Sequence, residues 1–104
     1  MNESQEKPTT SITQSKTLLQ QYIKSIGIMN KQTANEYYVR LSNFERFLLS
    51  RYEKDIDTFV KELKEGKFDT YETLSDYCIY LQNSNIYTST LKQRVITVKN
   101  FLIQ

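Results

Sequence analysis

The amino-acid sequence predicts an all-α protein, a compact bundle of four to five helices. Helix breakers are scarce: the 104 residues include two Gly and one Pro, and the Pro lies at position 8. From about Lys16 onward, apolar residues recur at the three- and four-residue intervals of a helix. Eight Tyr and five Phe give this chain, 38% hydrophobic overall, enough large side chains for one modest core.

Residues 1–13 are rich in Ser, Thr, Gln and Glu, and we expect them to form a disordered polar tail. The helical domain is expected over residues 14–104. Its first helix is predicted over Gln14–Ile26 and should end at Gly27, because glycine readily adopts the left-handed conformation found after a helix. The expected apolar face of this helix consists of Leu18, Leu19, Tyr22, Ile23 and Ile26.

The second helix is expected to begin at a capping box formed by Thr33 and Glu36, although Asn30 would cap it one turn earlier. Apolar residues then follow at intervals of four, three, four and four. They form a core stripe of Tyr37, Leu41, Phe44, Leu48 and Tyr52. The opposite side is nearly all polar, with Asn35, Val39, Ser42, Asn43, Arg46 and Ser50.

A short helix is predicted within Asp55–Glu65, capped by Asp55 or Asp57 and ended by Gly66. Its buried side chains should be Phe59, Val60 and Leu63. A fourth helix should start near Asp69 or Thr70, where Asp69 and Glu72 again have capping-box spacing. It should end in the polar run 83–85, and its inward face should be Leu74, Tyr77, Cys78 and Leu81.

The last predicted helix begins at a Thr88 or Ser89 cap and buries a narrow stripe of Leu91, Val95, Val98 and Leu102. Off this stripe lie groups that can meet phosphates or base edges: Lys92, Gln93, Thr97, Lys99 and Asn100. Ile96 and Ile103 fall on the same side as the two lysines. Partial burial under the segment 55–67 is our preferred interpretation; contact with a catalytic domain or a neighbouring protomer is the alternative.

Charge is unevenly distributed along the sequence. The net charge of +2 divides into +3 for residues 1–54, −4 for residues 55–76 and +3 for residues 77–104, a stretch without Asp or Glu. Such a pattern is expected if one face of the protein meets phosphates and another does not. Chance segregation on a solvated surface explains the charges equally well.

Several function classes are disfavoured by composition. The chain has no His and one Cys, which excludes a disulfide framework, His-based acid–base catalysis and the usual zinc sites. There is no glycine-rich phosphate loop, so we expect a protein that is not an enzyme and needs no cofactor or metal. Cys78 is interpreted as a small buried side chain in a reducing compartment. No apolar run is long enough to cross a bilayer and no secretory signal is present, so we expect a cytoplasmic location without membrane contact.

Three motifs occur in a characteristic order. The pattern Thr33, Tyr37, Leu41, Phe44, Phe47 and Leu48 resembles a helix of the core-binding domain of tyrosine recombinases, the phage-type integrases. Thr90, Leu91, Val95, Val98, Lys99 and Phe101 are similar to the last helix of that domain. Between them, Tyr77, Tyr80 and Leu81 match its "Y-x-x-Y-L" helix. The resemblance covers about Lys16 to Leu102.

The resemblance implies a SAM-like helical bundle that forms half of a clamp around double-stranded DNA during DNA integration or recombination. In the family, a separate C-terminal domain carries the nucleophilic tyrosine, and this sequence contains none of it. We therefore expect a non-catalytic DNA-binding domain whose further partners are that catalytic domain and other recombinase protomers. The alternative is a SAM-like helical protein–protein interaction module, because fold alone does not fix function.

By position, the resemblance implies a DNA-facing surface on the second and last helices, made of Lys31, Arg40, Asn43, Arg46, Ser89, Lys92, Gln93 and Lys99. Two departures from the family pattern affect it. Gln93, followed by Arg94, replaces a frequent arginine, and Lys99 replaces another, which keeps the charge but loses the planar fork of the guanidinium. The amides of Asn43 and Gln93 are suited to adenine edges, although amides on a helix exterior are usually just solvated.

Overall fold

A computed structural model describes residues 17–104, and this part of the chain is helical throughout apart from short connections. The helices are α2 (Thr17–Met29), α3 (Lys31–Tyr52), α4 (Ile56–Lys64), α5 (Thr70–Gln82) and α6 (Thr88–Leu102). The predicted all-α class is confirmed for these residues. The expected polar tail and the expected start of the first helix at 14–16 lie outside the described residues.

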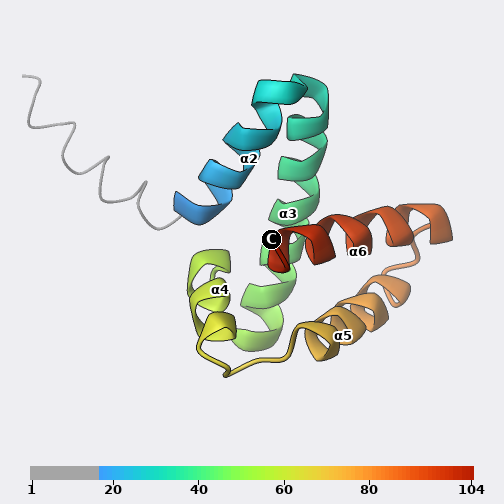
Figure 1. Cartoon of the computed structure of the whole chain (residues 1–104). Helices are drawn as coiled ribbons and strands as arrows, with labels where there is room; N and C mark the ends of the chain where they lie inside the picture. Colours follow the sequence, from blue (N-terminus) through green and yellow to red (C-terminus); the bar gives the residue numbers. More distant parts are fainter. Residues whose placement is uncertain (1–16) are drawn as a thin grey trace, which may run out of the picture.

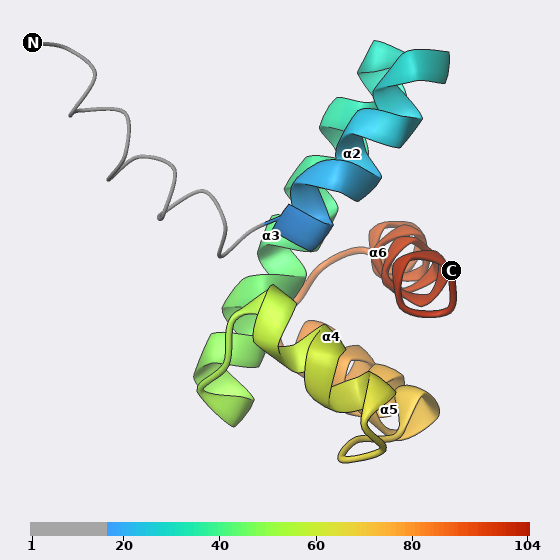
Figure 2. The same cartoon turned by 60° about the vertical axis from the view of Figure 1, so that its left-hand side comes forward.

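The long helix α3 organises the molecule. Helix α2 runs back along its first half as an antiparallel hairpin, and α4 and α5 lie around its other end (Figure 1). Helix α6 crosses α3 and also packs on α5, and Figure 2 shows it nearly end-on beside the α2–α3 hairpin. The crossing brings the middle of α3 next to α6, far away in the sequence.

Aromatic rings fill the core around α3. Phe44 and Phe47 both pack against the ring of Tyr77 on α5, with centroid separations of 5.0 and 5.1 Å. Phe59 on α4 lies edge-on to Phe44, and Tyr22 on α2 meets Phe101 on α6 at 5.1 Å. All helices therefore contribute to one core. Of the predicted α3 stripe, Leu41, Phe44 and Leu48 are buried, whereas its outer members Tyr37 and Tyr52 are half-buried.

The α2–α3 connection differs from the prediction. Gly27 does not end α2, which continues to Met29; it lacks a positive φ angle, and the amide of Asn30 still bonds to the carbonyl of Ile26 at 2.9 Å. Asn30 caps α3 by accepting from the amide of Thr33 at 3.0 Å, so the alternative cap is the correct one. One residue can serve both helices because its amide completes α2 while its side chain caps α3. Leu18, expected on the buried face, is exposed.

The caps of α4 and α5 follow the prediction. The carboxylate of Asp55 accepts from the amide of Thr58 at 2.8 Å, and that of Asp69 accepts from the amide of Glu72 at 2.9 Å. Gly66, with φ of 85°, follows the end of α4 as expected. Phe59 and Val60 are buried, but Leu63 and Cys78 are only half-buried.

The inward face of helix α6 is wider than the stripe that the sequence predicted. Val98 of that stripe is buried, Leu91, Val95 and Leu102 are half-buried against the core, and Thr97 and Phe101 are buried as well. The cause is that α6 packs on α3 and α5 together, so its inward face includes a polar residue that has a partner on α3. Neither Thr88 nor Ser89 caps the helix. Tyr87 occupies the cap position without a side-chain hydrogen bond.

Ile96 on α6 and Ile103, which follows the helix, are more exposed than our preferred interpretation of partial burial expected. They are 56% and 53% exposed. None of the helices over residues 17–104 has the length and apolar character required to cross a membrane.

Candidate nucleic-acid interface

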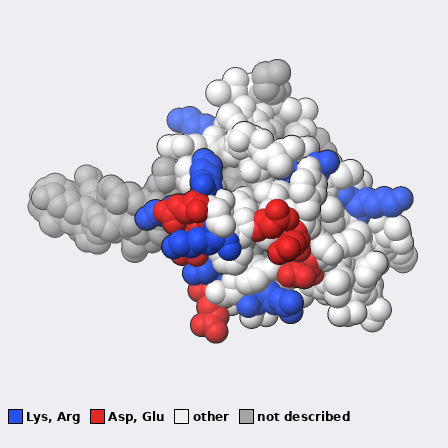
Figure 3. Space-filling view, turned by 60° about the horizontal axis from the view of Figure 1, so that its bottom comes forward, with Lys and Arg blue, Asp and Glu red and all other residues white. Residues whose placement is uncertain are grey.

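Paired charges collect at the α4–α5 end of the molecule. Acidic residues of the 55–76 segment make ion pairs there, at 3.0 Å for Lys54–Glu62, 3.4 Å for Lys67–Glu65 and 3.8 Å for Arg51–Asp76. Viewed from this side, lysines and arginines lie next to carboxylates (Figure 3). Three of the seven acidic residues of this segment thus pair with nearby cations, and two others, Asp55 and Asp69, cap α4 and α5.

In contrast to these paired cations, several cations on α6 and on the exposed side of α3 have no partner among the described residues. Within residues 17–104, no ion pair or hydrogen bond is formed by the side chains of Arg46, Lys92, Arg94 and Lys99. Their charges therefore have no carboxylate partner among these residues. This agrees with the segregation that the sequence predicted and leaves α6 as a cationic element.

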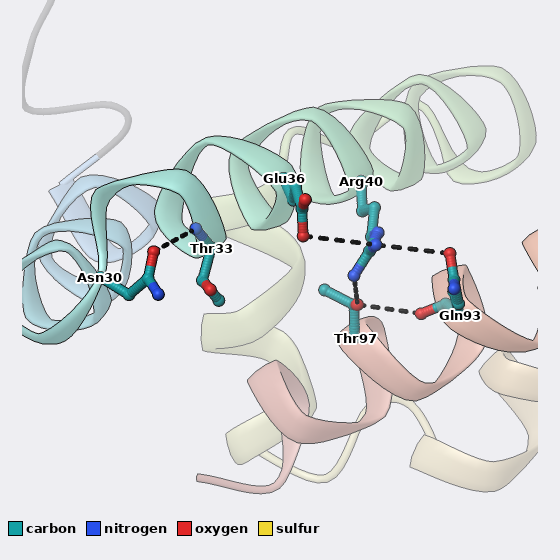
Figure 4. Close-up of polar contacts among 6 residues, drawn as sticks. All are labelled: Asn30, Thr33, Glu36, Arg40, Gln93 and Thr97. Carbon is teal, nitrogen blue, oxygen red and sulfur yellow. Dashed lines mark hydrogen bonds and ion pairs between the residues drawn. The ribbon is translucent and has the colours of Figure 1, made fainter.

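Arg40 links α3 to α6 (Figure 4). Its Nη1 donates to the hydroxyl of Thr97 at 3.2 Å, and its Nη2 donates to Oε1 of Gln93 at 3.4 Å. Nη2 also lies 3.8 Å from the carboxylate of Glu36, one turn earlier on α3. The guanidinium is held in place by groups on two helices, and 23% of its side chain remains exposed.

The spacing of these residues explains why the network forms. Glu36 and Arg40 are four residues apart on α3, and Gln93 and Thr97 are four apart on α6, so each pair lies on one side of its helix. Where the helices cross, the two sides face each other. Thr97 is buried, and its hydroxyl donates to the carbonyl of Gln93 at 2.9 Å while accepting from Arg40. Its polar group is therefore fully used.

The network borders a groove of about 370 Å³ between α3 and the first half of α6. Of the predicted DNA-facing residues, the structure brings Arg40, Asn43 and Gln93 together here. The remaining lining comes from Asn35, Glu36, Val39, Thr90 and Arg94.

Arg94 was not among the predicted site residues, although the sequence analysis noted it beside Gln93. It is half-buried, lines the groove and makes no hydrogen bond within residues 17–104. Its charge acts on Tyr77, whose buried hydroxyl has no hydrogen-bond partner among the described residues. Burial raises the pKa of Tyr77 to about 12, although the charge of Arg94 acts to lower it. In the sequence, Arg94 could have been found from its four-residue spacing from Thr90, because that spacing places both residues on the same side of α6.

The other predicted residues lie apart from this groove. Lys31 borders a separate hollow between α2 and α3, and Arg46 and Ser89 are exposed outside the groove. Lys92 borders a hollow between α5 and α6, and Lys99 is exposed. The eight predicted residues therefore do not form one continuous surface.

The start of α6 lies at the same end of the groove as Thr90. Helices α3, α4 and α5 each have a side-chain oxygen that accepts from a first-turn amide, whereas Tyr87 offers none to α6. The first-turn amides of α6 thus lack a side-chain cap, and amides at a helix start are effective donors to phosphate oxygens.

Among residues 17–104, no cluster of His, Cys, Asp and Glu is suited to a metal ion. Comparison with known protein families, characterised proteins and solved structures gives no match. The function must therefore be argued from the groove and its chemistry.

Proposed function

We propose that this chain is a non-catalytic domain that binds duplex DNA in a site-specific tyrosine recombinase, with a SAM-like core-binding fold. The observation that carries the DNA-binding part is the α3–α6 groove, in which two guanidinium groups and three amides from two helices converge. Cleavage and joining of strands would belong to a catalytic domain elsewhere in the protein.

The groove presents donors more than acceptors. Oε1 of Gln93 already accepts from Arg40, which leaves the amide nitrogen of Gln93 to donate outward. Arg94 has no carboxylate partner within residues 17–104, and the charge of Glu36 is offset by Arg40. Most of the exposed lining of the groove is apolar, but the polar groups that border it are mainly donors, and donors suit the acceptor-only phosphates of a DNA backbone.

The recombinase part of the proposal is supported by the sequence motifs and their order. Most of the α3 motif is structural: Leu41, Phe44, Phe47 and Leu48 are buried. Such residues define a helical bundle rather than a function. The combination of this bundle with Arg94, a groove residue of α6 without an ion-pair partner within residues 17–104, favours the recombinase domain over the other function classes that we considered.

The DNA-binding proposal is tested by fluorescence anisotropy with a labelled duplex across a salt series. Affinity should fall steeply with salt, with a log–log slope of about −0.9 for each phosphate contacted. Arg94→Glu should weaken binding by about tenfold or more. The matched controls are Lys61→Glu and Lys64→Glu, which make the same charge change at exposed positions on α4 and should change affinity by less than about threefold.

Two outcomes decide against the proposal. If no salt-dependent DNA binding is found, the alternative of a helical protein–protein interaction module takes its place. If the α4 controls weaken binding as much as Arg94→Glu does, the attraction depends on net charge and the groove is not the site. The recombinase assignment has its own test in the coding sequence downstream, which should specify the tyrosine and arginines of a catalytic domain.

A further inference from the structure

A second surface lies on the outer side of α6, away from the α3–α6 groove. Between α5 and α6 there is a hollow of about 520 Å³ with a predominantly apolar lining. The apolar groups come from Cys78, Ile86, Leu91, Val95 and Ile96, and Lys92 is the one charged residue in the lining. We call this surface, together with the exposed Lys99 and Ile103, the outer α6 face.

Aliphatic and cationic side chains alternate along the outer α6 face. Lys92, Ile96, Lys99 and Ile103 follow one another at intervals of four, three and four residues, which places them on one side of the helix. Both isoleucines are more than half exposed. Neither lysine has an ion-pair partner within residues 17–104, and residues 77–104 contain no Asp or Glu.

We propose that the outer α6 face binds an amphipathic helix of a partner protein that carries aliphatic anchors flanked by carboxylates. An aliphatic stripe on the partner would cover Ile96 and fill the hollow above Cys78, and its acidic residues would pair with Lys92 and Lys99. Helices commonly dock in this way, with anchors at positions i, i+3 or i+4, and i+7.

Charge favours an acidic partner helix over a second copy of this chain, and the exposed isoleucines favour it over DNA. A second copy docked symmetrically would place Lys92 and Lys99 against the same lysines, and like charges in an interface are unfavourable. In the 55–76 segment of a second copy, Glu62, Glu65 and Asp76 already pair with cations of their own chain and Asp55 and Asp69 cap helices, which leaves few of its seven acidic residues to pair with Lys92 and Lys99. DNA would leave the isoleucines without an apolar partner.

This inference does not depend on DNA binding. Gln93 and Arg94 border the α3–α6 groove, whereas Lys92 and Ile96 border the hollow on the other flank of α6. The two surfaces use different residues of one helix. Variants of each can therefore be tested without altering the other.

The test is selection of a phage-displayed library of helical peptides against the full-length protein. We expect the enriched peptides to carry aliphatics at helical spacing together with a net negative charge. Binding of a selected synthetic peptide should weaken at least tenfold in Ile96→Asp and about fivefold in Lys92→Glu. Repeating the selection on the Lys92→Glu, Lys99→Glu double variant should enrich peptides of net positive charge.

Matched controls are available elsewhere on the surface. Ile28→Asp makes the same change as Ile96→Asp at an exposed isoleucine of α2, and Lys61→Glu matches Lys92→Glu. Both should leave peptide affinity within twofold. Cys78 gives a readout without mutation, because it is the only cysteine in the chain and lies in the hollow. The bound peptide should slow the reaction of its thiol with a disulfide reagent at least fivefold.

Three results of the peptide experiments would overturn the inference. They are a selection without enriched helices, enrichment of neutral or basic peptides on the unaltered protein, and peptide binding that is insensitive to Ile96→Asp. Loss of duplex binding in the Lys92→Glu, Lys99→Glu variant, with Arg94→Glu unaffected, would also overturn it, because the outer α6 face would then be the DNA surface. Folding of each variant is checked by circular dichroism.

Discussion

The guanidinium of Arg40 donates a hydrogen bond of 3.2 Å to the hydroxyl of Thr97, which is 57 residues away in the sequence. Thr97 is only 1% exposed, and its hydroxyl in turn donates to the backbone of α6. A buried polar side chain of one helix thereby sets the position of a partly exposed cation on another. The same contact fixes the angular orientation of α6 and one edge of the groove.

Replacing Thr97 with Val should show whether the hydroxyl of Thr97 orients Arg40 in addition to stabilising the fold. Valine keeps the shape of threonine but cannot accept from Arg40, so we expect the free energy of unfolding to fall by about 1 kcal/mol. DNA affinity should fall by more than this stability change explains, because Arg40 loses a fixed orientation. Urea denaturation measures the change in the free energy of unfolding, and fluorescence anisotropy with the labelled duplex measures the change in DNA affinity.

The control for Thr97→Val is Thr97→Ser, which retains the hydroxyl and should restore DNA affinity. A double-mutant cycle with Arg40→Met should give a coupling energy of about 0.5–1.5 kcal/mol. Equal DNA affinity in the Val and Ser variants would show that Thr97 only packs and does not orient Arg40.

Local sequence signals predicted most of the fold. The spacing of Leu41, Phe44 and Leu48 identified the buried side of α3, and Asp55 and Asp69 identified the starts of α4 and α5. These signals succeed because periodicity and capping depend on residues within one or two turns.

The burial of Thr97 on α6 could not be found in the same way. Aliphatic spacing identified a face that included Leu91 and Leu102, and the observed inward face includes Thr97 as well. The Thr97 hydroxyl is satisfied inside the protein by the carbonyl of Gln93 and by Arg40, and the contact with Arg40, 57 residues away, cannot be predicted from the residues around Thr97. Arg94 lines the groove whereas Lys92 borders the hollow on the other flank of α6, so the predicted site was only partly assembled.

Glu45 is a second buried polar group, and its partner lies on another helix, 11 residues further along the sequence. Its carboxylate accepts from the amide of Ile56, the first residue of α4, at 2.9 Å. We expect Glu45→Ala to lower the free energy of unfolding by about 2 kcal/mol, because a charge-assisted hydrogen bond at a helix start is lost. Glu45→Gln should lower the free energy of unfolding by about half as much. The exposed Glu65→Gln is the control and should change stability by less than about 0.5 kcal/mol in urea denaturation.

The buried hydroxyl of Tyr77 makes stability depend on alkaline pH. Its pKa is raised from 10.0 to about 12 by burial. Between these values the unfolded chain has released the proton while the folded protein keeps it, so unfolding is increasingly favoured as pH rises. Tyr77→Phe should reduce the loss of stability between pH 9 and pH 11, measured by urea midpoints. It should cost little at pH 7, because the hydroxyl has no hydrogen-bond partner within residues 17–104. An unchanged alkaline slope would contradict the assignment.

At position 87, before the start of α6, we expect a capping residue to raise the stability of the protein and to weaken DNA binding. The side chain of Tyr87 is 83% exposed and does not cap the helix. Tyr87→Ser supplies a hydroxyl for the first-turn amides, so the free energy of unfolding should rise by about 0.5–1 kcal/mol.

The same hydroxyl should compete with DNA phosphates for the first-turn amides, and duplex affinity should fall about two- to fivefold. Tyr87→Ala is the control for loss of the ring, since alanine removes the ring without providing a cap. We expect it to give no gain in stability and a smaller loss of affinity than serine. If both variants weaken binding equally, the tyrosine ring and not the helix start contacts the DNA.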